Sequence, residues 1–414
     1  MTQFLLTNAR IFDGVSGDCP EGMSILVEDG LIREISGRAI AAPQAVGIDV
    51  GGRTVMPGLI DAHVHAYASD ANVQKIDRAG EAYRTAHAVR MLGHALDCGF
   101  TTVRDIGGGD FGLARAIEDR LIRAPRFFYA GKALSMTGGH GDLRGPNDSC
   151  HTSGYCSCGA SNSICVIADG VDGCIKAVRE ELRRGAHCIK IMASGGVASP
   201  TDPLWMNQYR EDEIRAIVNE TSERRTYTAA HCHPAEAIRR CVAFGVRSIE
   251  HGTLIDEQTA QFAASEGAFI VPTMAVIFSL RAMMPKLGLS AAIQEKLDHT
   301  YKQALSGMDI MRNAGVNVCF GTDLLGAGYI ERCREFAIRR EVFSPLEILR
   351  QATSTGAALL LHDDRLGCIK PGAFADLLVV DGDPLKDIGL LADDGRKLAL
   401  IMRSGEIVKD TLGR

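Results

Sequence analysis

Long hydrophobic runs are missing from this chain of 414 residues: no stretch reaches the ~18 consecutive apolar residues that a membrane-spanning helix needs. The first 14 residues, MTQFLLTNARIFDG, lack the basic and long apolar regions of a signal peptide and are typical of a strand. The 13 cysteines are an odd number spread over the chain, which favours reduced thiols. We therefore expect a cytoplasmic protein without a membrane partner.

The chain also lacks a strong excess of charge of either sign. The 45 basic residues form no long run, and the formal net charge is only −6, so nucleic acid is not an expected partner. The chain has no internal repeat of fixed period and no low-complexity segment. Its 46% hydrophobic content and its length suffice for one large domain and a smaller one.

Short strand patterns occupy both ends of the chain. They include FLLTNARIF and MSILVEDGLIREIS in residues 1–56, and GCIKPGAFADLLVVDGDP and LALIMRSGEIV in residues 363–414. Alternating strands at both ends predict one small β-sandwich domain that the two chain ends form together.

Residues 57–362 instead alternate strand-like and helix-like segments. EDEIRAIVNETSERR places Ile214, Ile217 and Val218 on one helical face, and PAEAIRRCVAFG has Pro234 at a helix start. The strand candidates are GLIDAHVH, FTTVRDIG, RFFYAGKAL, CIKIMAS, TYTAAHCH, SIEHGT, FIVPTM and VNVCFGTD. Eight strands with intervening helices predict an α/β fold, a (β/α)₈ TIM barrel. The rival, a doubly wound open sheet, lacks a Gly-rich phosphate loop after its first strand.

Polar residues gather at the ends of these predicted strands, where active sites of such barrels lie. They are His63, His65, Lys190, His231, His233, His251 and Asp323. His63 and His65, like His231 and His233, have the i, i+2 spacing that points two side chains of a strand to the same face. Two imidazoles on one face can hold a metal ion, but either pair alone also fits histidines at an exposed strand end.

Lys190 lies inside CIKIMAS between Ile189 and Ile191. Burial disfavours a charged lysine and lowers its pKa, and a neutral amine can add carbon dioxide and become a carbamate, an anionic ligand that bridges two metals. The alternative is a lysine that reaches solvent or pairs with an acid. Asp323 has two interpretations as well: a metal ligand that takes a proton from bound water, or the cap of the next helix.

Two further features have open interpretations. Cys150, Cys156, Cys158 and Cys165 lie in a Ser- and Gly-rich segment without a CxxC pair, and we favour a loop over the active site with free thiols over a structural zinc site. Trp205 and Tyr209 follow PTDP, and either line the substrate pocket or pack a loop.

The motifs PGLIDAHVH, IKIMASGGVASPTDP, AAHCHPAEAI, IEHGTLID, FGTDLLG and GCIKPGAFADLLVVDGDPL together carry a resemblance. Along nearly its whole length the chain resembles the amidohydrolase superfamily. Within it, the GGVASPTDP run is similar to the binuclear branch of Xaa-Pro dipeptidases, carboxypeptidases and amidases that cleave ochratoxin-type N-acyl amino acids.

The resemblance implies two divalent ions, with zinc as the default for this ligand set. His63, His65 and Asp323 would hold the more buried ion, His231 and His251 the more exposed one, and carboxylated Lys190 would bridge them. His140, in TGGHGD, matches a family histidine that contacts the substrate carbonyl. His233 departs from the family, whose related sequences carry tyrosine there, so its part in substrate binding is open.

The implied reaction is hydrolysis of an amide bond in a dipeptide or N-acyl amino acid. A metal-bridging hydroxide would attack the carbonyl, and Asp323 would act as general base and then as general acid. An imidazolonepropionase-like hydrolase of cyclic amides is the alternative, because the metals do the same work on either bond. A non-catalytic scaffold should lack some ligands, whereas all six positions are filled. The sequence leaves a homo-oligomer open.

Overall fold

The computed structural model describes residues 3–144, 163–199, 202–288 and 290–413. Of the four clustered cysteines, Cys150, Cys156 and Cys158 lie outside these ranges, so the predicted thiol-bearing loop stays a prediction. Cys165 is described and buried. Within the described ranges, no helix combines the length and the apolar character needed to cross a membrane.

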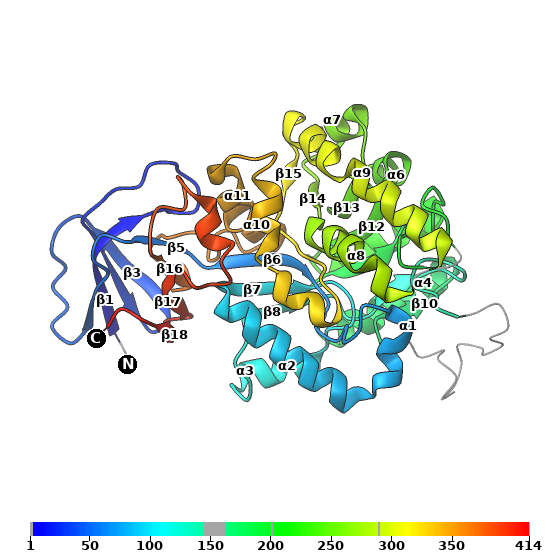
Figure 1. Cartoon of the computed structure of the whole chain (residues 1–414). Helices are drawn as coiled ribbons and strands as arrows, with labels where there is room; N and C mark the ends of the chain where they lie inside the picture. Colours follow the sequence, from blue (N-terminus) through cyan, green and yellow to red (C-terminus); the bar gives the residue numbers. More distant parts are fainter. Residues whose placement is uncertain (1–2, 145–162, 200–201, 289, 414) are drawn as a thin grey trace.

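Both chain ends contribute to one eight-stranded sheet, at the left of Figure 1, where the two termini also lie. Its order is β18-β17-β16-β5-β1-β2-β3, with β4 paired to β1. Antiparallel pairing of β5 with β16 joins the two ends. The strands are β1 (Gln3–Ile11), β2 (Met23–Glu28), β3 (Leu31–Ser36), β4 (Val46–Asp49), β5 (Thr54–Pro57), β16 (Leu377–Val380), β17 (Leu398–Arg403) and β18 (Glu406–Asp410).

Strand β16 is hydrophobic at every position because both of its faces are buried. Leu377 and Val379 pack in the core of the eight-stranded sheet. Leu378 and Val380 pack in the main core of the molecule. One strand thus fixes the small sheet against the rest of the chain, while the proposed domain limits, 1–56 with 363–414 and 57–362, stay a prediction.

The central strands form two parallel sheets, β6-β7-β8 and β10-β9-β11-β12-β13-β14-β15. Backbone hydrogen bonds join them at two places, from Ala62 N to Phe320 O (2.9 Å), after β15, and from His187 N, before β11, to Tyr129 O (2.8 Å). The strands are β6 (Leu59–Val64), β7 (Phe100–Asp105), β8 (Arg126–Tyr129), β9 (Ala133–Ser135), β10 (Cys165–Ile167), β11 (Ile189–Met192), β12 (Thr228–Pro234), β13 (Ser248–Leu254), β14 (Phe269–Val271) and β15 (Asn317–Val318). Each of the eight predicted segments contains a strand.

One predicted strand needs correction. RFFYAGKAL forms two strands, β8 and β9, that belong to different sheets. The chain breaks at Gly131, whose φ of +70° is left-handed, and a Cβ there would lie 2.1 Å from Oε2 of Glu181. Strand β10 was not predicted at all.

Helices surround the parallel strands, with α2 and α3 on one side and α6 to α9 on another (Figure 1). The predicted helix at Ile214 and Ile217 is confirmed as α5, which buries both residues, and Pro234 is the N-cap of α6. The helices are α1 (Val73–Ile76), α2 (Glu81–Asp97), α3 (Phe111–Glu118), α4 (Gly170–Arg183), α5 (Glu211–Glu223), α6 (Ala235–Ala243), α7 (Glu257–Ser265), α8 (Met274–Leu287), α9 (Ala291–Asn313), α10 (Arg334–Arg339), α11 (Pro345–Gln351) and α12 (Ser354–Leu359), with 3₁₀ turns η1 (Asp77–Ala79), η2 (Gly326–Glu331) and η3 (Ile388–Leu391).

Candidate metal centre

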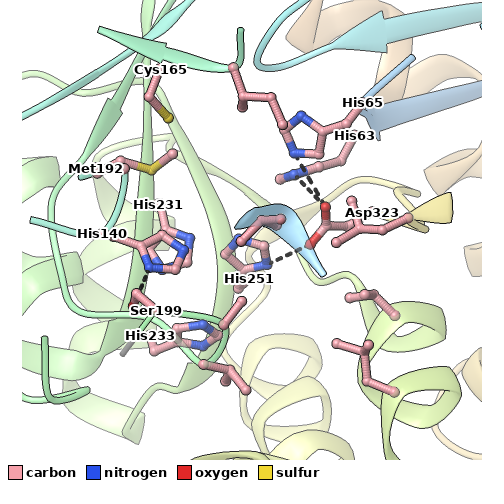
Figure 2. A pocket seen from close by; sticks show the side chains of 18 of the residues that line it. His63, His65, His140, Cys165, Met192, Ser199, His231, His233, His251 and Asp323 are labelled. Atoms are coloured by element: carbon pink, nitrogen blue, oxygen red, sulfur yellow. Dashed lines mark hydrogen bonds and ion pairs between the residues drawn. The ribbon is translucent and has the colours of Figure 1, made fainter. Parts of the chain in front are cut away.

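The first histidine pair faces Asp323, in the segment that follows the last strand, β15. His63 lies in β6 and His65 directly after it, and both reach the carboxylate of Asp323 (Figure 2). The Nε2 atoms of His63 and His65 lie 3.4 and 3.3 Å from Oδ1 of Asp323. The i, i+2 spacing therefore places both imidazoles on one side, as predicted.

Backbone contacts fix the position of Asp323 beside the two histidines, and in the described part of the chain its side chain caps no helix. Its backbone N–H donates to the carbonyl of His63 (2.8 Å), and the following 3₁₀ turn η2 has Leu325 as its N-cap. Both Asp323 and His251 have left-handed backbones, with φ of 54° and 71°. Such conformations cost free energy in non-glycine residues and cluster at functional sites. Ligand atoms of His63, His251 and Asp323 all lie within 4.8 Å of one another.

The second histidine pair lies on the other side of the same pocket. His231 and His233 belong to β12, and His251 to β13. The ring of His231 lies 4.5 Å from that of His251 and stacks at 4.2 Å on that of His140. His233 stacks at 5.0 Å on His251. The structure thus brings together every histidine that the sequence placed at a strand end.

Lys190 completes the group. It lies in β11, it is only 1% exposed, and it lines the same pocket as the histidines and Asp323. Among the described residues, none makes a hydrogen bond or an ion pair with its amine. Burial, opposed by the charges of Glu250 and Asp323, lowers the pKa of Lys190. This environment fits the carbamate interpretation better than a lysine that reaches solvent.

The far side of the pocket favours neutral imidazoles, whereas at His65 the hydrogen bond and charge of Asp323 outweigh burial and raise the pKa. Burial and neighbouring imidazoles lower the pKa of His231 and His251 well below the usual value, and lower that of His233 to about 3. Burial would raise the pKa of Asp323, but the imidazoles of His63 and His65 outweigh it and hold this pKa well below the ordinary range. Neutral histidine and ionised aspartate are the forms that bind metal ions.

The orientation of the imidazoles supports this fit. The Nδ1 atoms of His63, His65 and His251 already have partners: Glu250 Oε2 (2.7 Å), the Gly107 carbonyl (2.9 Å) and Thr273 Oγ1 (2.7 Å). The Nε2 atoms of His63 and His231 are buried and have no hydrogen-bond partner within the described ranges. Buried donors or acceptors without a partner are costly, and a metal ion would satisfy them.

Two charged residues behind the ligands were missed by the sequence analysis. Glu250 accepts from His63 and is paired with Arg104 through Nη2 at 2.8 and 3.0 Å, and both side chains are fully buried. Arg104 also donates through Nε to the carbonyl of Ala62 (2.6 Å), next to His63. Each follows an apolar residue of a predicted strand, Val103 or Ile249, but is followed by a polar one, so the two-sided apolar flank that singled out Lys190 is missing.

Asp61, in the DAHVH motif, connects β6 with the segment that carries Asp323. It accepts hydrogen bonds from the backbone N–H of His63 (3.2 Å) and Thr322 (3.1 Å), the residue before Asp323. A buried ion pair with Arg332 holds its carboxylate. Asp61 is thus a positioning residue between β6 and the segment that carries Asp323.

We expect Glu250→Gln to weaken metal binding by about 10- to 100-fold, because a neutral amide no longer orients His63 as a carboxylate does. Competition with a chromophoric chelator measures this affinity. Glu335→Gln is the matched control, since Glu335 forms another fully buried pair, with Arg339 (2.7 Å). Equal metal affinities of the two variants would contradict this role of Glu250.

His140 stands at the rim on a tightly packed loop. Its Nδ1 lies 2.8 Å from Ser199 Oγ, and its backbone N–H donates to Gln208 (2.9 Å). A Cβ on Gly196 would lie 2.1 Å from the His140 ring, so this close approach requires glycine. Gly196 belongs to a second loop, the one after β11. The amine of Lys296 holds this second loop by donating to the carbonyls of Gly196, Ser199 and Asp202.

The predicted substrate contacts have mixed outcomes. His233 lines the pocket, and its Nδ1 lies 2.6 Å from Thr253 Oγ1. Trp205 is 75% exposed and Tyr209 is buried, and neither is among the residues that line the pocket. The prediction that these two line the pocket is not supported, and their packing in the loop after β11 is the alternative that remains.

Comparison with known proteins agrees with this site. The Amidohydrolase family model matches residues 54–408. The chain is 31% identical over 369 residues to ochratoxinase from Aspergillus niger (86% of this chain, 75% of the relative), and 27% identical over 404 residues to imidazolonepropionase from Salinispora arenicola (91% and 90%). It is similar, with a TM-score of 0.95 and 42% identity over 99% of this chain and 100% of the other, to a crystal structure of a prolidase in complex with N-methylphosphonate-L-proline.

The chain therefore belongs to the amidohydrolase family. Its fold is a TIM barrel with a second domain, as the family and its structural neighbours imply. It is a hydrolase that acts on C–N bonds, and metal binding is consistent with the superfamily.

Proposed function

We propose that this protein is a binuclear metal-dependent hydrolase that cleaves the amide bond of a dipeptide or an N-acyl amino acid. The observation that supports this most is the convergence of His63, Lys190, His231, His251 and Asp323 in one pocket. The similarity to a prolidase and to an ochratoxinase favours amide substrates of this kind.

In this proposal His63, His65 and Asp323 would hold one ion, and His231 and His251 would hold the other. Lys190, in its N6-carboxylated form, would be a ligand of both, and zinc is the expected metal because histidine and carboxylate ligands suit it. The ions would supply the Lewis acidity that lowers the pKa of a water and polarises a carbonyl.

The protein's own residues handle the protons. Asp323 accepts a proton from the attacking water and passes it to the leaving nitrogen, which leaves poorly unless it is protonated. His140, across the pocket and stacked on His231, donates to the carbonyl oxygen as negative charge develops on it. The hydrogen bond between Ser199 and Nδ1 of His140 leaves Nε2 of His140 for the substrate.

Apolar side chains cover much of the pocket and favour an apolar substrate group. Val276, Ile277 and Leu280 present one face of α8, and Leu297 of α9 adjoins them. Within the described part of the chain, Lys190 is the sole lysine or arginine that lines the pocket. We infer that α8 contacts an uncharged, hydrophobic side chain of the substrate.

Leu280→Asp should lower kcat/KM for apolar substrates by at least about tenfold, mainly through KM, because it places a charge against the bound apolar group. Steady-state kinetics with an aliphatic and a small polar substrate measure the difference. Ala282→Asp adds the same charge to an exposed position of α8 and should change neither constant. Equal losses on both substrates would contradict a specificity role.

The direct test is to incubate the zinc-loaded protein with a library of dipeptides and N-acyl amino acids and to identify products by mass. Release of free amino acids supports the proposal, and a library left intact contradicts it. A second library, of cyclic amides, tests the alternative that the similarity to imidazolonepropionase favours. Ring opening there, without cleavage of any linear amide, would replace the first function by the second.

A further inference from the structure

A second group of metal-binding side chains lies away from the pocket. The Sγ atoms of Cys98 and Cys333 and a carboxylate oxygen of Asp394 all lie within 4.8 Å of one another. None of the three lines the catalytic pocket. We propose that they form a separate site for a thiophilic divalent cation such as Zn²⁺, with His94 as the fourth donor.

Distant parts of the sequence build this group. Cys98 is the C-cap of α2, Cys333 is the N-cap of α10, and Asp394 precedes β17. The turn that carries Asp394 packs tightly on the end of α2: a Cβ on Gly395 would lie 2.1 Å from the carbonyl oxygen of Asp97. Asp394 itself has a left-handed backbone, with φ of 46°.

The spacing of His94 and Cys98 suits two donors of a tetrahedral site, although His94 is not part of the group whose ligand atoms all lie within 4.8 Å of one another. His94 lies one helical turn before Cys98, and its Nε2 is 3.6 Å from Cys98 Sγ. Two donors on a tetrahedral zinc, with Zn–N about 2.0–2.1 Å and Zn–S about 2.3 Å, lie about 3.6 Å apart. Two sulfurs on such an ion lie about 3.8 Å apart, and the Sγ atoms of Cys98 and Cys333 are no more than 4.8 Å apart.

The two buried thiols lie beside a cationic side chain, that of Arg332, the residue before Cys333. Nε of Arg332 is buried without a hydrogen-bond partner among the residues described. Both cysteines are buried while Asp394 is exposed, so an ion has a route from solvent.

Cobalt loading distinguishes this site from the catalytic centre, whose proposed ligands are nitrogen and oxygen. The full-length protein, stripped of metal and titrated with Co²⁺, should develop thiolate-to-cobalt charge-transfer absorption in the near ultraviolet. C98S/C333S should lose this band and about one equivalent of bound metal. C165S should keep it, although Cys165 lines the catalytic pocket.

Cys241→Ser is the matched control, because Cys241 belongs to another pair of buried thiols, with its Sγ 3.6 Å from that of Cys232. It should retain the band. Asp394→Asn changes an exposed side chain, so the variant should fold normally. It should weaken cobalt binding at this site by at least about tenfold, because the loss of even an indirect partner of a metal ion lowers metal affinity by about 10- to 100-fold.

Four outcomes would overturn the proposal. The wild type could show no thiolate–cobalt band, or C98S/C333S could keep it. If the double variant does not fold, an unchanged cobalt affinity in Asp394→Asn decides against the site. A Cys98–Cys333 disulfide in the isolated protein, with no extra metal bound after reduction, would replace the metal site by a redox pair.

Discussion

Asp323→Asn is expected to lower kcat by about 10²–10⁴-fold while the protein still binds part of its metal. The amide keeps one oxygen that can face a cation, but it cannot accept the proton of the attacking water. It also removes the negative charge that lies 3.3–3.4 Å from the Nε2 atoms of His63 and His65. Steady-state kinetics together with elemental analysis separate loss of the proton acceptor from loss of metal.

Asp256→Asn provides the control for Asp323. Asp256 accepts a hydrogen bond from the backbone N–H of Thr259 as the N-cap of α7, and Asn caps a helix about as well as Asp, so the variant should leave both stability and kcat nearly unchanged. An Asp323→Asn variant with near-wild-type turnover would remove Asp323 from the proton transfer.

Lys190→Ala has the second-largest expected effect: loss of the bridge, of at least part of the metal load, and of nearly all activity. The buried amine has no charged partner within the described ranges, so its removal alone should not expose an unpaired charge. Elemental analysis after gel filtration measures the bound metal. Full metal occupancy in this variant would contradict the carbamate.

Chemical rescue sharpens this test. A small carboxylic acid such as acetate should restore metal and activity to Lys190→Ala if the native group is an anionic carbamate, whereas an alkylammonium ion should restore neither. The reverse pattern would assign Lys190 to a cationic role. Lys132→Ala, at another lysine whose pKa burial lowers, should need no rescue.

Sequence periodicity predicted the central strands because each buried strand is an apolar run that ends at a polar residue, as GLIDAHVH ends at His63 and His65. It could not predict that RFFYAGKAL divides into two strands, because that division depends on the close packing of Gly131 against Glu181, which is distant in the sequence. Strand β10 was missed for a similar reason: Cys165–Ile167 is too short to show a period, and its pairing with β9 defines it.

The residues of the site likewise divide into those that the sequence predicts and those that only the fold reveals. The strand-end histidines, Lys190 and Asp323 were found because their own chemistry marks them. Trp205 was chosen by its position after PTDP and lies exposed, because local order does not fix which way a loop side chain points. The pairing of Glu250 with Arg104 joins two strands 146 residues apart, and only the fold shows it.

The central claim is that the pocket binds two divalent ions, with Lys190 between them. Diffraction from crystals of the zinc-loaded protein, recorded on both sides of the zinc absorption edge, tests it most directly. We predict two anomalous peaks, one beside His63, His65 and Asp323 and one beside His231 and His251, with carboxylate density on Lys190. A pocket without an ion, in crystals of protein that is fully active, would contradict the claim.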